Sequence, residues 1–254
     1  MRHVPTLFRR EVAAYFLGPM AFLILLAFQV IAWLNFWELV ESLARPPGAL
    51  STKFDPLNQY ISGSRLFWIA LLVAVPSLTM RLLSEERRSG TIESLLTVAV
   101  TEAEVVVSKW LAGVVMYLAL LAPFFLYLPF LYVQGKFHFD VGPVASLLIG
   151  LTTMGMMFVS VGLFFSALTR NQVIAAIWTF LALFLLVFLT LLVYMLASDR
   201  QSPWAEGLQY VTLIHQLQAF GSGKLDVRFL TLHLSLTAFM LYVTTKVVEA
   251  RKAG

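Results

Sequence analysis

Six long runs without a charged residue constrain this chain more than any other feature of its sequence. The runs cover residues 12–37, 66–80, 110–135, 141–169, 171–198 and 229–245. Four of them exceed the roughly 20 residues that a helix needs to cross the hydrocarbon core of a bilayer. Each run must be helical in lipid, because no water is present there to satisfy a free backbone group. The sequence therefore predicts an all-α integral membrane protein with six transmembrane helices.

The second and sixth runs are shorter than this length. Arg65 and Arg81 flank the second run, and Arg228 and Lys246 flank the sixth. Long basic side chains can lie along an apolar surface while their charge reaches the lipid headgroups. Both short runs are therefore also predicted to span.

The composition is that of a chain whose solvent is lipid. Of the 254 residues, 59% are hydrophobic and only 13% are charged, about half the charged share of an ordinary soluble domain. Cysteine is absent, which excludes disulfides, thiolate nucleophiles and cysteine zinc sites. The basic residues lie between the apolar runs and form no concentrated stripe of the kind that nucleic-acid binding needs.

The basic residues also predict the orientation of the chain. With six crossings both termini lie on one side, which then holds eleven of the 18 Lys and Arg residues, and the opposite side holds seven. Cytoplasmic loops of membrane proteins are enriched in basic residues. Both termini are therefore predicted to be cytoplasmic.

Residues 5–16 form an amphipathic start to the chain. They begin basic and become apolar, and Pro19 follows just beyond. This pattern is typical of an interfacial elbow helix that leads into the first span. The alternative, in which these residues are the first turns of one long helix, stays open.

The segment 202–226, between the fifth and sixth runs, is predicted to be external and amphipathic. Ser202 can cap a helix, Pro203 suits its first position, and Gly221 and Gly223 suit its end. Apolar residues recur at three- and four-residue steps: Trp204, Leu208, Val211, Ile214 and Leu217. This helix is predicted to lie on the outer leaflet or over the spans, and the alternative is a lid over a substrate exit.

Motifs for catalysis are missing from the sequence. The stretch 221–224 superficially resembles a phosphate-binding loop, but Leu225 stands where Ser or Thr is required. The four histidines share no metal-ligand spacing. Ser160 and Gly162 hint faintly at an intramembrane protease, but small residues in a span more often allow close helix packing. The centres of the spans carry no charged residue, which argues against an ion-coupled transporter.

The stretch 82–109 is the most polar part of the chain. A short helix that begins near Thr91 would have one apolar face. That face holds Ile92, Leu95, Leu96 and Ala99. Thr101 and Glu104 have the spacing of a capping box at the start of the third span. The stretch therefore predicts an ordered cytoplasmic loop that carries a small apolar ridge among charged residues.

The same loop resembles the signature of ABC-2-type transporter permeases. The matching residues are Glu85, Glu86, Arg87, Gly90, Thr91, Ile92, Glu93, Ser94, Leu95, Leu96, Thr97, Val100, Thr101 and Lys109. Ala99 stands where the family usually has Pro. The length, the six-span layout and the elbow are similar to that family over nearly the whole chain. The segment 202–226 resembles the gliding-motility and multicopper-enzyme-maturation subgroup.

The resemblance implies a single transmembrane permease domain over residues 1–254, in which residues 91–97 are a coupling helix that docks in a groove of a separate ATPase. An apolar ridge within a charged rim has the composition of a small protein interface. The alternative is a helix that lies on the inner leaflet. The predicted ATPase-coupling residues are Glu85, Glu86, Arg87, Arg88, Gly90, Thr91, Ile92, Glu93, Leu95 and Leu96. Catalytic residues, a metal and a cofactor are not expected in this chain.

The resemblance also implies partners and a function. The chain is expected to be the permease subunit of an ATP-binding-cassette transporter in the bacterial cytoplasmic (inner) membrane, where it exports a substrate while a separate cytoplasmic ABC ATPase hydrolyses ATP. A second permease copy or a paralogue is expected to pair with it through spans one, two and five. The alternatives are a non-transporting anchor or scaffold of an envelope or motility assembly, and a membrane-embedded enzyme.

Overall fold

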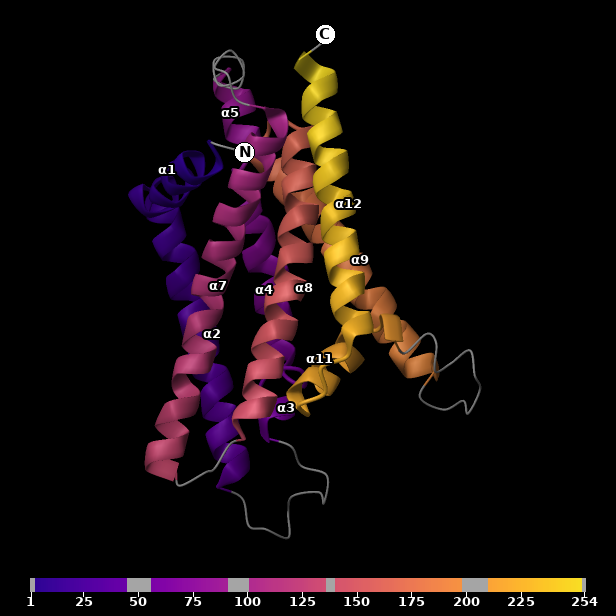
Figure 1. Ribbon diagram of the computed structural model, residues 1–254. Coiled ribbons are helices and arrows are strands. Elements are labelled where there is room, and N and C mark those ends of the chain that lie inside the picture. Colours follow the sequence, from indigo (N-terminus) through magenta and orange to yellow (C-terminus); the bar gives the residue numbers. More distant parts are fainter. Residues whose placement is uncertain (1–2, 45–55, 91–100, 136–139, 198–209, 253–254) are drawn as a thin grey trace.

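The regular elements of the described residues are all helices, which form one elongated bundle (Figure 1). The computed structural model describes residues 3–44, 56–90, 101–135, 140–197 and 210–252. The helices are α1 (Val4–Leu17), α2 (Pro19–Leu43), α3 (Pro56–Tyr60), α4 (Arg65–Thr79), α5 (Ser84–Ser89), α7 (Glu102–Gly135), α8 (Val141–Leu168), α9 (Gln172–Ala197), α11 (Leu213–Gly221) and α12 (Val227–Lys252). The prediction of an all-α protein is confirmed for this part of the chain.

Five helices in the described residues are long and apolar enough to cross a membrane: α2, α7, α8, α9 and α12. The sixth predicted span is α4, which has only 15 residues and is therefore about 22 Å long. It runs back along the bundle and packs mainly against α2 and α9, behind α7 and α8 in the view of Figure 1. By length and composition the structure thus gives five candidate spans, with a shorter apolar helix at the position of the second run.

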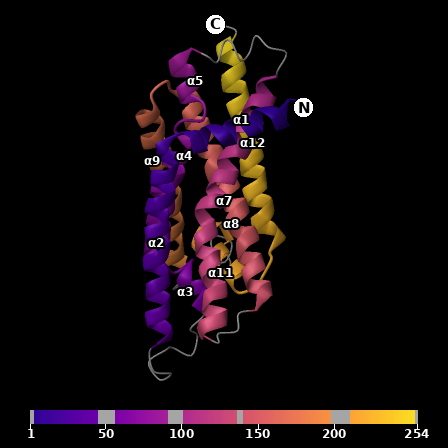
Figure 2. The same ribbon diagram turned by 90° about the vertical axis from the view of Figure 1, so that its left-hand side faces the viewer.

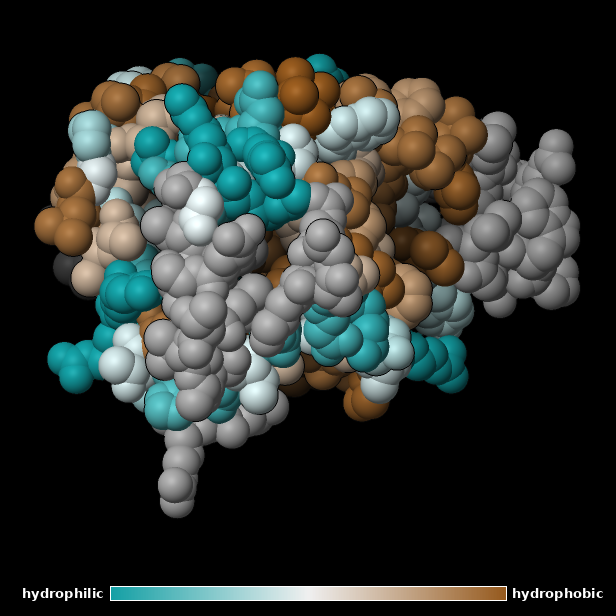
Figure 3. All heavy atoms as spheres, turned by 90° about the horizontal axis from the view of Figure 1, so that it is seen from above, coloured by the Kyte–Doolittle hydropathy of each residue, from teal (hydrophilic) through white to brown (hydrophobic). Residues whose placement is uncertain are grey.

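The two ends of the bundle differ in what they hold. The end with α1, α5 and the last turns of α12 is called the termini end, and the opposite end, toward which α3 and α11 lie, is called the far end (Figure 1). Seen from the termini end, hydrophilic residues gather on the face, and many hydrophobic residues lie around its margin (Figure 3). This is the distribution expected when the sides of the bundle contact lipid and its end contacts water.

The first apolar run is divided into two helices. α1 ends at Gly18, whose backbone is extended (φ −98°, ψ 143°), and Pro19 begins α2. Proline at a first helical position has no amide proton to leave unpaired and already holds the required φ. α1 therefore turns across the side of the bundle, and α2 runs along it (Figure 2). The start of the first long helix is Pro19, and not Val12 where the charge-free run begins.

α8 forms the centre of the bundle because small residues let its neighbours approach. A Cβ atom on Gly155 would overlap the Tyr117 ring of α7, and one on Gly162 would overlap the Thr79 side chain of α4. Ser160 is fully buried and donates its hydroxyl proton to the Met157 carbonyl 2.7 Å away. Ser160 and Gly162 thus have ordinary packing roles, as the sequence favoured over a protease site.

α11 is shorter than the amphipathic helix predicted from residue 202, and it lies against the bundle. It begins after a break at Thr212 and ends at Gly221, and Gly223 follows with φ 80°. Residues 202–209, which hold the predicted cap and the first half of the apolar face, lie outside the described residues. Within α11, Leu217 is buried as predicted, whereas Val211, before the break, is 55% exposed. The break rotates the buried face onto Leu213, Gln216, Leu217 and Phe220.

Candidate functional site

The charged half of the predicted coupling loop is a short helix, α5, that directly follows α4. Glu85, Glu86, Arg87 and Arg88 lie on α5, and Gly90 ends it with φ 72°. Glycine is the residue that most easily takes this left-handed conformation at the end of a helix. The other predicted coupling residues, namely Thr91, Ile92, Glu93, Leu95 and Leu96, lie outside the described residues. The described part of the predicted coupling site is therefore its α5 side.

One serine of α8 holds the start of α5. The Ser166 hydroxyl oxygen accepts hydrogen bonds from the amides of Leu83 (3.0 Å) and Ser84 (3.1 Å), and the hydroxyl donates to the Met80 carbonyl at 3.1 Å. The first amides of a helix have no partner within the helix, so an oxygen from outside must satisfy them when they are buried. Ser166, which is itself fully buried, thus fixes α5 to the end of α8.

A second contact fixes the other half of α5. The Arg87 guanidinium donates a hydrogen bond to the carbonyl of Ala167, near the end of α8. The last carbonyls of a helix also lack internal partners and carry partial negative charge, which favours a cation there. The structure thus places the head of Arg87 against α8, and its predicted part in the charged rim around a docking ridge stays a prediction.

A buried lysine joins α5 to α1 and α7. The Lys109 ammonium of α7 lies 3.0 Å from the Glu11 carboxylate of α1 and 2.9 Å from the Glu86 carboxylate of α5. The Lys109 side chain is 3% exposed, and the two carboxylates are 13% and 15% exposed. Arg10 approaches both carboxylates, at 3.2 Å from Glu11 and 3.6 Å from Glu86. These four residues, Arg10, Glu11, Glu86 and Lys109, are called the ionic cluster.

The ionic cluster balances two negative charges with two positive charges. Burying one ammonium alone would be strongly unfavourable, and two well-placed carboxylates offset that cost. Each ion pair with Lys109 joins different helices, so the cluster ties the loop helix α5 to the amphipathic α1 and the long α7. Sequence reasoning singled out Glu86 as a coupling residue and Lys109 as a signature residue, but it did not pair them and missed Glu11 as a site residue. Residues 11 and 109 are too far apart for any local pattern to pair them.

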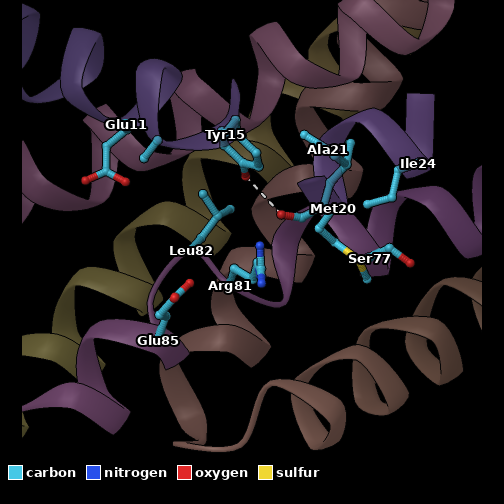
Figure 4. A pocket seen from close by; sticks show the side chains of 11 residues that line it. Glu11, Tyr15, Met20, Ala21, Ile24, Ser77, Arg81, Leu82 and Glu85 are labelled. Carbon is cyan, nitrogen blue, oxygen red and sulfur yellow. Dashed lines mark hydrogen bonds between the residues drawn. The ribbon is translucent and has the colours of Figure 1, made fainter. Parts of the chain in front are cut away.

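A small cavity lies beside the ionic cluster, between α1, α2 and the end of α4 (Figure 4). Its volume is about 90 Å³, and it is lined by Glu11 of α1, by Arg81 of the turn between α4 and α5, and by Glu85 of α5. The Tyr15 hydroxyl donates to the Leu78 carbonyl at 2.9 Å, which ties α1 to α4 at this level. Burial raises the pKa of Tyr15 above its ordinary value, so this hydroxyl keeps the proton that it donates. The cavity has room for a few waters and makes the junction of α1 with α4 less tightly packed than the ionic cluster.

The start of α7 has the capping box predicted from the sequence. The Glu104 amide donates to the Thr101 hydroxyl at 3.4 Å, and the Thr101 amide donates to the Glu104 carboxylate at 3.3 Å. The two bonds satisfy amides that the helix cannot satisfy internally. α7 therefore begins at Glu102, about two turns before Lys109 and eight residues before the charge-free run. This prediction is confirmed.

Within the described residues, no group of three or more His, Asp or Glu side chains has the arrangement of a metal site. At the termini end, charges and hydrogen bonds join α1, α5, α7 and α8 next to the predicted coupling segment. Residues 46–244 match the sequence model of a family described as "ABC-2 family transporter protein". No curated protein matches the chain.

Proposed function

This chain belongs to the ABC-2 family of transporter proteins, and we propose that it is the permease subunit of an exporter. In this proposal the chain exports a substrate while separate ABC ATPase subunits hydrolyse ATP. Membership of the family makes the chain a multi-pass component of a membrane transporter, and five candidate spans agree with this. The position of the ATPase, the direction of transport and the coupling residues belong to the proposal.

The observation that carries the proposal is the attachment of α5. The predicted coupling helix, residues 91–97, follows α5 after Gly90. α5 is bonded to α8 through Ser166 and Arg87, and to α1 and α7 through the ionic cluster. A push on the coupling helix would reach α5 first, and from there it would be carried to three helices by short polar contacts. This is what a permease needs if ATP-driven closure of its partner is to tilt its spans.

The attachment of α5 also divides the predicted coupling residues into two groups. Glu86 and Arg87 are engaged with the permease's own helices, whereas Arg88 is exposed on α5. We assign Glu86 and Arg87 to the transmission of movement, and Glu85, Arg88, Glu93, Leu95 and Leu96 to the contact with the ATPase. Thr91 and Ile92 complete the coupling helix that begins after Gly90.

Six crossings are part of the proposal, with α4 as the short second span. α2 and α4 run in opposite directions, and α1 and the end of α12 lie at the same end of the bundle (Figure 1). Arg65 and Arg81 at the two ends of α4 can extend its reach to the headgroups. Both termini are then cytoplasmic, and the far end faces outward.

Pairing with a second permease copy or a paralogue through α2, α4 and α9 is the remaining part of the proposal. α9 buries only 17% of its most apolar stretch, and α2 buries 28%. Phe180, Phe184 and Phe188 of α9 stack on one another along an exposed face. Such faces can contact either lipid or a second subunit. Permeases of the ABC-2 family often form dimers, and this favours a second subunit.

The likeness to the gliding-motility and multicopper-enzyme-maturation subgroup stays a prediction. It depends on segment 202–226, and only residues 210–226 of this segment are described.

Co-expression with candidate ATPase subunits, followed by detergent pull-down and an ATPase assay, tests the proposal. Leu95→Asp with Leu96→Asp is expected to abolish the complex, because two carboxylates in an apolar interface core have no partner. Leu225→Asp, the same chemical change at an exposed residue of the far end, is the matched control and is expected to leave the complex intact. If the wild-type chain bound no ATPase, or bound one without changing its turnover, the scaffold alternative would replace transport.

The orientation is tested separately with single cysteines, since the chain has none of its own. Lys224→Cys lies at an exposed site of the far end, and Arg88→Cys lies at an exposed site of the termini end. A membrane-impermeant maleimide is expected to label Lys224→Cys in intact cells, and Arg88→Cys only after permeabilisation. The reverse pattern would put both termini outside and contradict the proposal.

A further inference from the structure

A second cavity lies at the far end, between α2, α3 and the start of α4, well away from the ionic cluster. Its volume is about 490 Å³, within the range of pockets that hold small molecules. Its polar lining comes from Asn35, Glu38 and Ser42 of α2, Tyr60 of α3, and Ser64 and Arg65 at the start of α4. The proposed coupling at the termini end makes no use of this cavity.

Two opposite charges line the cavity without pairing. Glu38 and Arg65 are both exposed, and among the described residues neither makes an ion pair. An acid and a guanidinium that share a cavity would attract one another if their side chains could meet. Since they remain apart, the space between them suits a ligand that carries both charges, with its cation near Glu38 and its anion near Arg65.

The buried wall of the cavity adds an acceptor and a donor in fixed positions. Asn35 is 2% exposed, and its amide nitrogen donates to the Tyr60 carbonyl at 2.9 Å, which leaves the amide oxygen as an acceptor. Ser64 is 5% exposed, and its hydroxyl oxygen accepts from the Phe67 amide at 3.2 Å, which leaves the hydroxyl proton as a donor. The acceptor lies on the helix of Glu38, and the donor precedes Arg65. The neutral acceptor of Asn35 is thus on the same side of the cavity as the acid Glu38, and the neutral donor of Ser64 is on the same side as the guanidinium of Arg65.

The cavity lies at the level where lipid headgroups are expected. Trp33 and Trp37 of α2 are 51% and 53% exposed, and exposed tryptophans concentrate at the boundary between hydrocarbon and water. The Trp37 indole N–H donates to the Glu41 carboxylate at 2.7 Å. A carboxylate at this position also fits the headgroup region, where water is present. Glu38 follows Trp37 directly, which places the acid of the cavity at the same depth.

We propose that this cavity binds a phosphodiester that carries a primary ammonium, the chemistry of an ethanolamine phospholipid headgroup. The Arg65 guanidinium and the Ser64 hydroxyl hold the phosphate, because a guanidinium and a hydroxyl donate well to phosphate oxygens. Glu38 and the Asn35 amide oxygen accept from the ammonium. A quaternary choline headgroup has no N–H to donate, and a glycerol headgroup has no cation, so the site discriminates against both.

Lipid titrations of the full chain in detergent, followed by native mass spectrometry, test this inference. The ligands are phosphatidylethanolamine, phosphatidylcholine and phosphatidylglycerol with the same acyl chains. Glycerophosphoethanolamine, which has the same headgroup without chains, separates a lipid site from a site for a soluble zwitterion. The variants are Glu38→Gln and Arg65→Gln, and Glu41→Gln, close by on α2 but outside the cavity lining, is the matched control.

We expect the wild-type chain and Glu41→Gln to bind phosphatidylethanolamine about tenfold more tightly than the other two lipids, the effect of about one charge-assisted hydrogen bond. Glu38→Gln should lose the preference over phosphatidylglycerol, and Arg65→Gln should weaken binding of the ethanolamine headgroup. Binding of glycerophosphoethanolamine as tight as that of the lipid would identify a soluble zwitterion as the source of the same chemistry. Equal binding of all three lipids, or a preference that both cavity variants retain while they unfold at the wild-type temperature, would overturn the inference. Neither lipid binding nor the unfolding temperature depends on an ATPase. Failure of this inference would therefore leave the proposed transport function untouched.

Discussion

α5 and α11 are two short helices that attach to opposite ends of the same long helix, α8, by different chemistry. At each end a buried serine of α8 takes part: Ser166 accepts from the first amides of α5, and Ser146 donates to the Phe220 carbonyl at the end of α11. Beyond the serines the ends diverge. The termini end adds the ionic cluster, with two carboxylates and two cations, whereas the far end adds hydrogen bonds between neutral groups.

The neutral contacts of α11 form a series of hydrogen bonds through His233 of α12, which is called the neutral chain. The Gln216 amide nitrogen donates to the Tyr210 carbonyl at 2.7 Å, which turns its oxygen toward the His233 Nε2 atom 2.9 Å away. Nε2 therefore carries the imidazole proton, and Nδ1 faces the Thr153 hydroxyl at 3.1 Å. His233 is thus an ordinary hydrogen-bonded residue of the bundle. The neutral chain joins α11, α12 and α8 without a net charge.

The two attachments should therefore differ in how much stability is lost when one partner is removed. Loss of one partner from the ionic cluster leaves a buried charge, whereas loss of one partner from the neutral chain leaves only a polar group without a hydrogen bond. The first loss costs several times more than the second. The stronger attachment of α5 would also suit the proposed transmission of force from an ATPase.

The largest expected effect is that of Lys109→Met, which removes the central cation of the ionic cluster. Glu11 and Glu86 would then face one another with only Arg10 as a partner, and the free energy of unfolding should fall by about 3–5 kcal/mol. Thermal unfolding in detergent measures the loss. Lys246→Met, which removes the lysine of an exposed ion pair with Glu249, is the matched control and should change the transition little. Equal effects of the two changes would show that the cluster is not buried.

Close packing at the far end gives the next largest effect. A Cβ atom on Gly150 would overlap the Phe220 ring of α11, so Gly150→Ala should push α11 away from α8 and cost about 1–3 kcal/mol. Gly142→Ala, near the start of the same helix, has nothing within 4 Å of the added carbon and should be close to neutral. The measurement is thermal unfolding together with hydrogen exchange of the α11 amides. An unchanged α11 in Gly150→Ala would contradict the close approach.

Removal of the histidine tests the neutral chain itself. His233→Ala leaves the oxygen of the buried Gln216 without its donor, and the expected cost is about 1 kcal/mol, since hydrogen bonds within membrane bundles contribute modestly. Thr231→Ala, at an exposed hydroxyl two residues earlier on α12, should cost less. The comparison between the ends would fail if His233→Ala proved as damaging as Lys109→Met.

The sequence predicted the long helices well because hydropathy is a local signal. α8 and α9 begin and end within a residue of their charge-free runs, and the capping box of Thr101 and Glu104 fixes the start of α7. α4 is the exception, because a run of 15 residues cannot be distinguished by length from a buried helix of a soluble protein. Its six-crossing assignment therefore remains part of the proposal.

The candidate site was predicted only in part, for a physical reason. The charges of α5 were visible in the sequence, but their contacts were not. Ala167 lies 80 residues from Arg87. Glu11 lies 98 residues from Lys109, the lysine that pairs with both Glu11 and Glu86. Apolar periodicity reports which face of a helix is buried, and it carries no information about which distant residue will meet it. The interpretation of Glu86 and Arg87 as rim residues of an interface was drawn from charges on a loop, and it stays a prediction.

The smallest expected effect is a dependence on pH that is confined to the far end. Burial, and to a lesser degree the positive charge of Lys224, lower the pKa of His215 on α11 below its ordinary value of about 6.5. The unfolded chain then binds a proton more readily than the folded chain, so the stability that neutral His215 contributes is present above pH 6.5 and declines as the pH falls below it. Hydrogen exchange of the α11 amides should accelerate between about pH 7 and pH 5.5 more than that of the α5 amides, after correction for the intrinsic rate. The variant His215→Gln should remove the part of this slope that the His215 side chain causes. An equal slope in α5 and α11, or a slope unchanged by His215→Gln, would mean that the neutral end is no more sensitive to protons than the charged end.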